Sequence, residues 1–187
     1  MKRILTTLVC LALLGCASTK SPPPAPPSTQ AKINQPAQQV QEAPPIDKSN
    51  DVYKVELATA SFSVPTSMTL DKENSTDGVM IYTTEDHSMV FGVSSENDSM
   101  DIDRYAQITV IAAKLKNIDV LQIREGAIDN QRALMLVMRQ SENGIIDLHF
   151  IVRNQKLMMN FDCGMPISSA KKNSKTCSQI IDSIKLK

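Results

Sequence analysis

The sequence predicts an α+β fold in which a mainly antiparallel sheet of about six to seven strands is flanked by two helices. Three observations support this prediction. Near residue 50 the composition changes from proline-rich and polar to mixed apolar and charged, several later segments alternate apolar and polar residues, and two segments repeat apolar residues with the helical period. A single domain of ordinary size is therefore expected over residues 51–187.

Strands are expected at residues 52–64, 79–84, 89–94, 120–126, 131–141, 145–153 and 156–163. The first helix is expected over residues 101–116. Its predicted apolar face consists of Tyr105, Ile108, Ala112 and Leu115. The second helix is expected to begin at Pro166, because proline is favoured in the first turn of a helix. Its predicted stripe consists of Ala170, Ser174, Cys177, Ile181 and Ile184.

The turn between the last two strands sets how they pair. A two-residue turn at residues 154–155 pairs Phe150 with Met159 and Ile146 with Cys163. All four side chains then lie on one face, which we interpret as core.

For the preceding hairpin a two-residue turn at Asn143 and Gly144 is the default, but it places Arg139 on the core side. A three-residue loop, Glu142 to Gly144, keeps Arg139 outside and is the register that we predict. It sets Arg139 opposite Asp147, with Asp162 beyond, as a cross-strand ion-pair group.

The same register places four apolar residues, together with His149, on the outer face. They are Met135, Val137, Ile151 and Met158. Either the first helix covers them or they stay partly exposed. Methionine-rich surfaces adapt to varied partners, so these four form the candidate partner surface.

The N-terminal residues have the pattern of an exported lipoprotein. Two basic residues precede an apolar run at residues 4–14, too short to span a bilayer, and the run ends in LLGC, which resembles the bacterial lipobox. We expect residues 1–15 to be removed as a signal peptide and Cys16 to be acylated with palmitate-type chains, which anchor the protein in the membrane. Ala17 favours the outer membrane, with the domain in the periplasm. A soluble secreted protein cut elsewhere is the alternative.

Residues 16–50 are rich in Pro, Ala, Ser and Gln and contain few side chains large enough to bury. We interpret them as a disordered tether, which in polyproline II conformation would reach about 100 Å. A proline-rich recognition motif is the alternative interpretation.

Two cysteines remain for the domain, Cys163 and Cys177. In an oxidising compartment a disulfide between them is expected, and both are predicted to face the core. Closing the loop would stabilise the fold by about 3 kcal/mol in the chain-entropy model. A reactive thiol or half of a metal site is the alternative, and it requires a nearby base or further ligands.

The charge balance and the missing motifs argue against nucleic-acid binding and against the common kinds of catalytic and metal site. The chain has 20 basic and 20 acidic residues and no basic stripe for nucleic acid. It contains no Gly-x-Ser-x-Gly elbow, no His-x-x-x-His pair and no phosphate-binding glycine loop. Both histidines, His87 and His149, are interpreted as solvent-facing structural residues. The acidic stretch SENDSMDIDR is interpreted as helix capping by Ser99 or Asp101 rather than a calcium loop. We therefore predict a protein with no catalytic residue, metal or cofactor.

The order of the elements, together with FSVP at residues 62–65, IDNQRA at residues 128–133 and the closing IIDSIKL, resembles the PsbP-like fold, in particular the bacterial DcrB-type lipoproteins. The resemblance covers residues 52–187. It implies an antiparallel sheet flanked by helices, and members that mostly serve as assembly factors, chaperones or binding modules. It brings no catalytic residues.

Three functions fit these observations. The first is a non-catalytic lipoprotein that docks another envelope protein. The second is a small-molecule or lipid-binding module, with a cavity between sheet and helix lined by Tyr82, Phe91 and Tyr105. The third, an immunity protein against a periplasmic toxin, differs from the first only in its partner.

Overall fold

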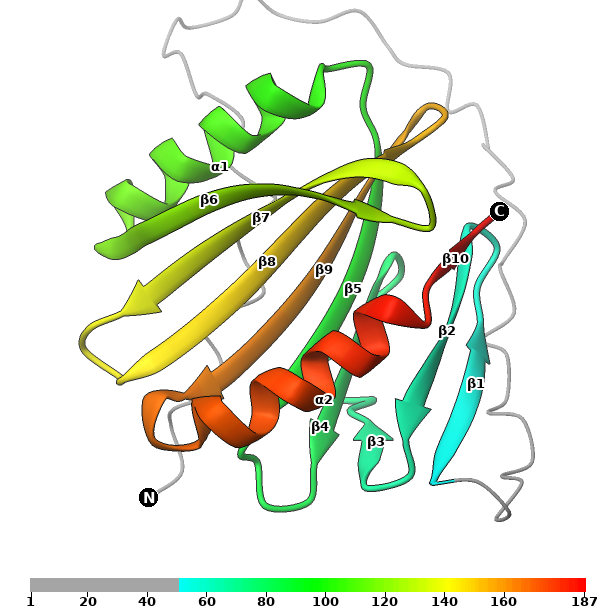
Figure 1. The fold of residues 1–187 in the computed structure, drawn as a ribbon, viewed down its shortest axis with the longest axis vertical. Coiled ribbons are helices and arrows are strands. Elements are labelled where there is room, and N and C mark those ends of the chain that lie inside the picture. The colour runs from blue at the N-terminus through cyan, green and yellow to red at the C-terminus, as the bar shows by residue number, and fades with distance from the viewer. Residues whose placement is uncertain (1–50) are drawn as a thin grey trace, which may run out of the picture. The chain divides into compact units, whose positions relative to one another are not determined.

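A computed structural model describes residues 51–187 of the protein (Figure 1). Seven strands form an antiparallel sheet in the order β3-β4-β5-β9-β8-β7-β6, and three form a small second sheet in the order β1-β2-β10. The α+β fold with a mainly antiparallel sheet and two helices is thus confirmed.

The strands of the large sheet are β3 (Met68–Leu70), β4 (Val79–Thr84), β5 (Val90–Asn97), β6 (Ile118–Ile128), β7 (Gln131–Gln140), β8 (Ile145–Asn154) and β9 (Leu157–Pro166). The small sheet contains β1 (Val52–Glu56), β2 (Ala60–Pro65) and β10 (Lys185–Leu186). The helices are α1 (Ile102–Leu115), the short 3₁₀ helix η2 (Ile167–Ser169) and α2 (Ala170–Asp182). The expected strand at residues 52–64 is therefore two strands, and both lie outside the large sheet.

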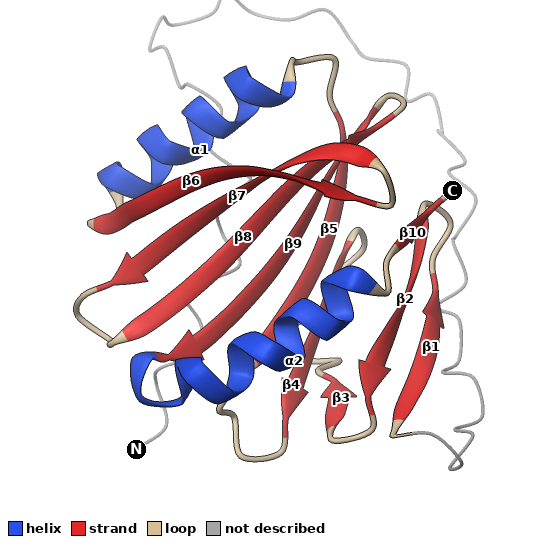
Figure 2. Ribbon diagram, viewed as in Figure 1, coloured by secondary structure: helices blue, strands red, loops and turns tan. Residues whose placement is uncertain are grey.

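The two helices lie on opposite faces of the large sheet (Figure 2), and each covers its own core. Because side chains alternate along a strand, consecutive residues of β9 belong to different cores. Met159 and Phe161 pack under α2, whereas Met158 packs under α1. The sheet is therefore the middle layer of three.

Asp101 is the N-cap of α1, and its Oδ1 accepts a hydrogen bond from the N–H of Asp103 at 2.8 Å. This confirms the capping interpretation of the acidic stretch. The predicted buried face of the helix is wrong, however: α1 buries Ile102, Ala106, Thr109 and Ala113. The small side chains in this row let the helix backbone approach the sheet closely, which turns the larger Ile108 and Leu115 outward.

The β8–β9 hairpin turns at residues 155–156 rather than 154–155, so Val152 pairs with Met159 and Phe150 with Phe161. In this register Asn154 stays within β8, and its Nδ2 donates to the main-chain oxygen of Lys187, 33 residues farther along the chain, at 2.8 Å. The shift relative to our prediction is two residues, so the face of every side chain is unchanged.

The β7–β8 register differs from the prediction by one residue. Gln140 pairs with Ile145 across a loop at residues 141–144, in which Gly144 has φ +61°. A slip of one residue turns every side chain of a strand to the other face. Arg139 therefore points to the α2 side, where its Nη2 donates to Asp119 at 2.9 Å in a partly exposed pair. The predicted pairing of Arg139 with Asp147 is wrong.

Cys163 of β9 and Cys177 of α2 form a disulfide, with their Cα atoms 6.1 Å apart. Both residues are fully buried. The bond joins the closing helix to the centre of the sheet, as the sequence predicts. α2 itself begins later than predicted, because Pro166 is the last residue of β9 and η2 intervenes.

Candidate functional site

The predicted partner surface does not exist as one surface. Met135 and Val137 face the α2 side and are half-buried, whereas Ile151 and Met158 are fully buried under α1. The one-residue difference in the β7–β8 register explains the separation. It places the β7 residues of the predicted surface on the opposite face of the sheet from the β8 residue. Of the four residues, Met135 and Val137 remain accessible to a partner.

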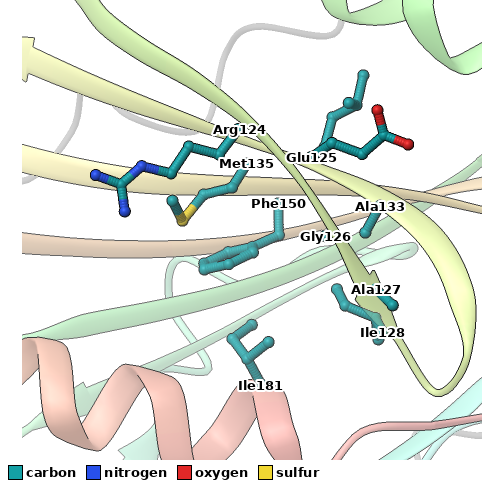
Figure 3. Close-up of a pocket in the computed structure, with 10 residues that line it drawn as sticks. Arg124, Glu125, Gly126, Ala127, Ile128, Ala133, Met135, Phe150 and Ile181 are labelled. Atoms are coloured by element: carbon teal, nitrogen blue, oxygen red, sulfur yellow. The ribbon is translucent and has the colours of Figure 1, made fainter.

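Met135 lines a cleft of about 160 Å³ on the α2 side of the sheet. Figure 3 shows its thioether beside the ring of Phe150, with Ile181 of α2 on the opposite wall. The remaining walls are formed by Arg124, Glu125, Gly126, Ala127, Ile128, Ala133 and Leu134. The cleft is thus an apolar recess between the edge of the sheet and the helix that closes the fold.

Gly126 keeps this recess open. In the β6–β7 ladder it pairs with Ala133, on the side that faces the cleft. A Cβ atom built on Gly126 would meet no heavy atom within 4 Å, and its backbone is not left-handed. The glycine is therefore not required by backbone conformation, and its missing side chain leaves space at the mouth of the cleft.

β6 forms one edge of the large sheet (Figure 1), and residues 121–127 are all exposed. Leu121 is 49% exposed and Ile123 is 53% exposed, and a bulge interrupts the ladder between Val120 and Gln122. An edge strand presents a row of N–H and C=O groups without partners in its own sheet. The opposite edge strand, β3, has only three residues.

A second group of polar side chains lies on the α1 face. The side chain of His149 is only 12% exposed, so the expectation that it faces solvent is wrong. Its Nδ1 is hydrogen bonded to Asp162, and Asp147 is buried two residues away on β8. The Nε2 of His149 and the Oδ1 of Asp147 have no hydrogen-bond partner within residues 51–187. We name these three residues the acid–imidazole cluster.

The charges in the acid–imidazole cluster oppose the effect of burial. Burial alone would lower the pKa of His149, but the hydrogen bond to Asp162 and the charges of Asp162 and Asp147 raise it above its ordinary value. Burial and repulsion from Asp162 raise the pKa of Asp147. Asp147 and His149 therefore bind protons more tightly in the folded domain than in the unfolded chain, which links the stability of the domain to pH.

Tyr105 extends the polar groups beneath α1. Its hydroxyl donates to Glu96 of β5 and accepts from the Nδ2 of Asn160 at 3.0 Å. Burial, followed by the hydrogen bond to Glu96, raises the pKa of Tyr105. In the part of the chain that the structure describes, no three His, Cys, Asp or Glu side chains are grouped so that they could hold a metal ion.

The ligand cavity predicted between Tyr82, Phe91 and Tyr105 is absent from the described domain. Tyr82 and Phe91 are buried beneath α2, with the ring of Phe62 5.5 Å from that of Phe91. Tyr105 lies on the other face of the sheet. The aromatic side chains fill their own core, and the cleft lined by Met135 lies elsewhere, beside β6.

The sequence predicts neither the edge position of β6 nor the cleft beside it. The alternation of apolar and polar residues across residues 118–128 is a signal for a strand, but it does not tell which neighbours the strand has. Cys16, the expected signal peptide and the expected tether lie outside the described residues. Among residues 51–187, no helix combines the length and the apolar character needed to cross a membrane.

Comparison with solved structures identifies a shared architecture. The solution structure of cyanobacterial PsbP (CyanoP) from Synechocystis sp. PCC 6803 matches with a TM-score of 0.59 over 73% of this chain and 93% of that one, at 11% identity. The domain has a PsbP-like fold. At this identity the likeness concerns the fold alone.

The crystal structure of LpqN, involved in cell envelope biogenesis of Mycobacterium tuberculosis, also matches. The match covers 73% of this chain and 92% of LpqN, at 13% identity and a TM-score of 0.48. That likeness is too weak to add to the assignment of the PsbP-like fold. No family model matches the chain, and no curated protein matches it.

Proposed function

We propose that this protein is a non-catalytic, DcrB-type lipoprotein of the bacterial envelope, anchored through Cys16 in the outer membrane, whose periplasmic PsbP-like domain docks an extended segment of another envelope protein along β6. The single observation that carries the docking proposal is the long exposed edge of β6 directly beside the apolar cleft. The anchoring part of the proposal is supported by the sequence LLGC and the apolar run before it.

Strand addition explains both features of the site. A partner strand that pairs with β6 would satisfy the edge N–H and C=O groups, and this supplies affinity without regard to sequence. Every second side chain of that strand would point toward the α2 side, where the cleft can accept one apolar group between Phe150 and Ile181. The cleft would then supply selectivity.

The hydrophobicity of the edge supports the same proposal. Long edge strands with exposed apolar residues promote aggregation unless they are covered. Leu121 and Ile123 are both about half exposed on β6. A partner that covers this edge removes the hazard.

Gly126→Val tests the proposal with little risk to the fold. Its side chain enters open space at the mouth of the cleft and improves the strand propensity of β6, so stability should be unchanged or slightly higher. A photoreactive amino acid at Ile123 of the full chain should crosslink one envelope protein in living cells, and Gly126→Val should abolish the product. Gln122→Val, on the same strand and the same side but outside the cleft, should retain it.

Amide hydrogen exchange of the complex locates the contact. The amides of β6 should become protected when the captured partner is added, and those of β3 should not. Equal crosslinking from Ile123 and from the exposed Gln179 of α2, or unchanged exchange in β6, would contradict docking along this edge.

The cleft also supports a second candidate function, the binding of a small amphiphilic molecule. Arg124 stands at the rim of an apolar recess, an arrangement that suits an anionic group with an apolar body. Native mass spectrometry of gently extracted protein should then show a retained ligand that Gly126→Val excludes. If the extracted protein carries no bound ligand, strand docking is the better explanation of the cleft.

A further inference from the structure

The outer side of α1 carries an exposed apolar row that strand docking does not use. Ile108 is 47% exposed, Ile111 is 59% exposed and Leu115 is 81% exposed. Their spacing of three and four residues aligns them along one side of the helix. This side is opposite to the row that contains Ala106 and Ala113, which packs on the sheet.

Two exposed cations flank this row, Arg104 and Lys114, and neither forms an ion pair within residues 51–187. The acid of the first turn, Asp103, is engaged by Arg132 of β7, with Nη2 and Oδ1 2.8 Å apart. The outer side of α1 is therefore apolar and positively charged. It is complementary to an apolar layer beneath negative charges.

The shape of the row favours a lipid surface over a protein. Three side chains on the outside of one helix form a narrow convex stripe, whereas a specific protein interface usually buries about 800 Å² on each partner. A helix with apolar residues on one side and cations beside them can lie in the plane of a bilayer interface with its apolar side in the headgroup region.

We infer that α1 docks on the surface of an anionic phospholipid bilayer. Ile108, Ile111 and Leu115 enter the boundary between headgroups and acyl chains, while Arg104 and Lys114 contact lipid phosphates. The C-terminal end lies deeper, because Leu115 is the most exposed of the three and the acids Asp101 and Asp103 lie at the other end of the helix.

This placement fixes the orientation of the domain. α1 and α2 lie on opposite faces of the large sheet (Figure 2), so the α1 face meets the bilayer and the cleft beside α2 faces away from it. Docking through α1 is independent of the proposed use of β6, because the two surfaces share no residue.

A single introduced tryptophan tests the inference, since the chain has no tryptophan of its own. The full chain carrying Leu115→Trp is reconstituted in vesicles of phosphatidylethanolamine and phosphatidylglycerol with brominated acyl chains. We expect the emission to shift to shorter wavelength and to be quenched by at least half. Ile167→Trp is the matched control: residue 167 is 50% exposed but precedes α2 on the other face, and its emission should stay unquenched.

The charge requirement is tested separately. Combining Leu115→Trp with Arg104→Gln and Lys114→Gln should lower the association constant for the bilayer about 30-fold. Each cation contributes about 1 kcal/mol of attraction to an anionic surface, and the variant loses two of them. Zwitterionic phosphatidylcholine vesicles should give little quenching. Equal quenching in both kinds of vesicle would overturn the anionic assignment.

Quenching of Leu115→Trp no stronger than that of Ile167→Trp would overturn the inference as a whole. The readout is local, so it does not depend on whether an N-terminal lipid holds the chain on the vesicle. If Leu115→Trp fails to fold, Ile111→Trp repeats the test at the neighbouring exposed position of the row.

Discussion

At the scale of single residues, the acid–imidazole cluster is the feature with the clearest consequence. The folded pKa values of Asp147 and His149 both lie above their unfolded values of about 3.9 and 6.5. Folding therefore favours the protonated forms. The resulting stability is fully present when the pH is below the unfolded pKa of each group and is lost as the pH rises through its folded pKa.

Asp147→Asn should remove most of this dependence. The amide resembles the protonated carboxyl in shape and carries no charge that burial could penalise, and His149 loses one of the charges that hold its proton. We expect the variant to be more stable than the natural chain at pH 8 by about 1 kcal/mol or more and similar at pH 4. Urea unfolding at a series of pH values measures this. Asp119→Asn, a change at an exposed surface pair with Arg139, should leave the slope between pH 5 and 8 unaltered.

At the scale of elements, the sequence predicts the strands and helices well because their apolar periodicity is local. It predicts the pairing of elements poorly, since pairing depends on contacts with distant residues. The predicted three-residue loop keeps Arg139 out of the core but places β7 one residue out of register with β8. In the structure Arg139 lies on the α2 side and donates to Asp119 of β6. The predicted partner surface depends on that register and is therefore wrong as well. Of its four residues, Met135 alone lines the cleft.

The orientation of α1 is another such case, and it can be tested by stability. Ala113 is fully buried against the sheet, so Ala113→Leu should overpack the interface and lower the free energy of unfolding by about 1–3 kcal/mol. Ile111→Ala on the exposed side should change it by less than about 0.5 kcal/mol. Chemical denaturation distinguishes the two variants, and the opposite ranking would mean that α1 packs through its apolar row.

At the scale of the whole molecule, the C-terminal segment connects the two sheets. α2 packs on the large sheet, and β10 then pairs with β2 of the small sheet. The last residue is held from both sides, because the Nδ2 of Asn154 donates to the main-chain oxygen of Lys187, whose Nζ reaches Glu56 at 2.6 Å. α2 and β10 therefore add to the direct packing of Phe62 from the small sheet on Tyr82 and Phe91 of the large sheet.

The Cys163–Cys177 bond fixes the position of α2, and its removal should weaken the whole domain. The two cysteines are 14 residues apart, so the chain-entropy model gives about 3 kcal/mol for closing the loop. The double variant Cys163→Ala, Cys177→Ala should lose about 2–4 kcal/mol in equilibrium unfolding of the full chain. Because α2 carries β10, hydrogen exchange should accelerate in α2, β10 and β2 before it does in β7 and β8. Uniform acceleration across both sheets would instead show that the bond stabilises the domain without acting through α2.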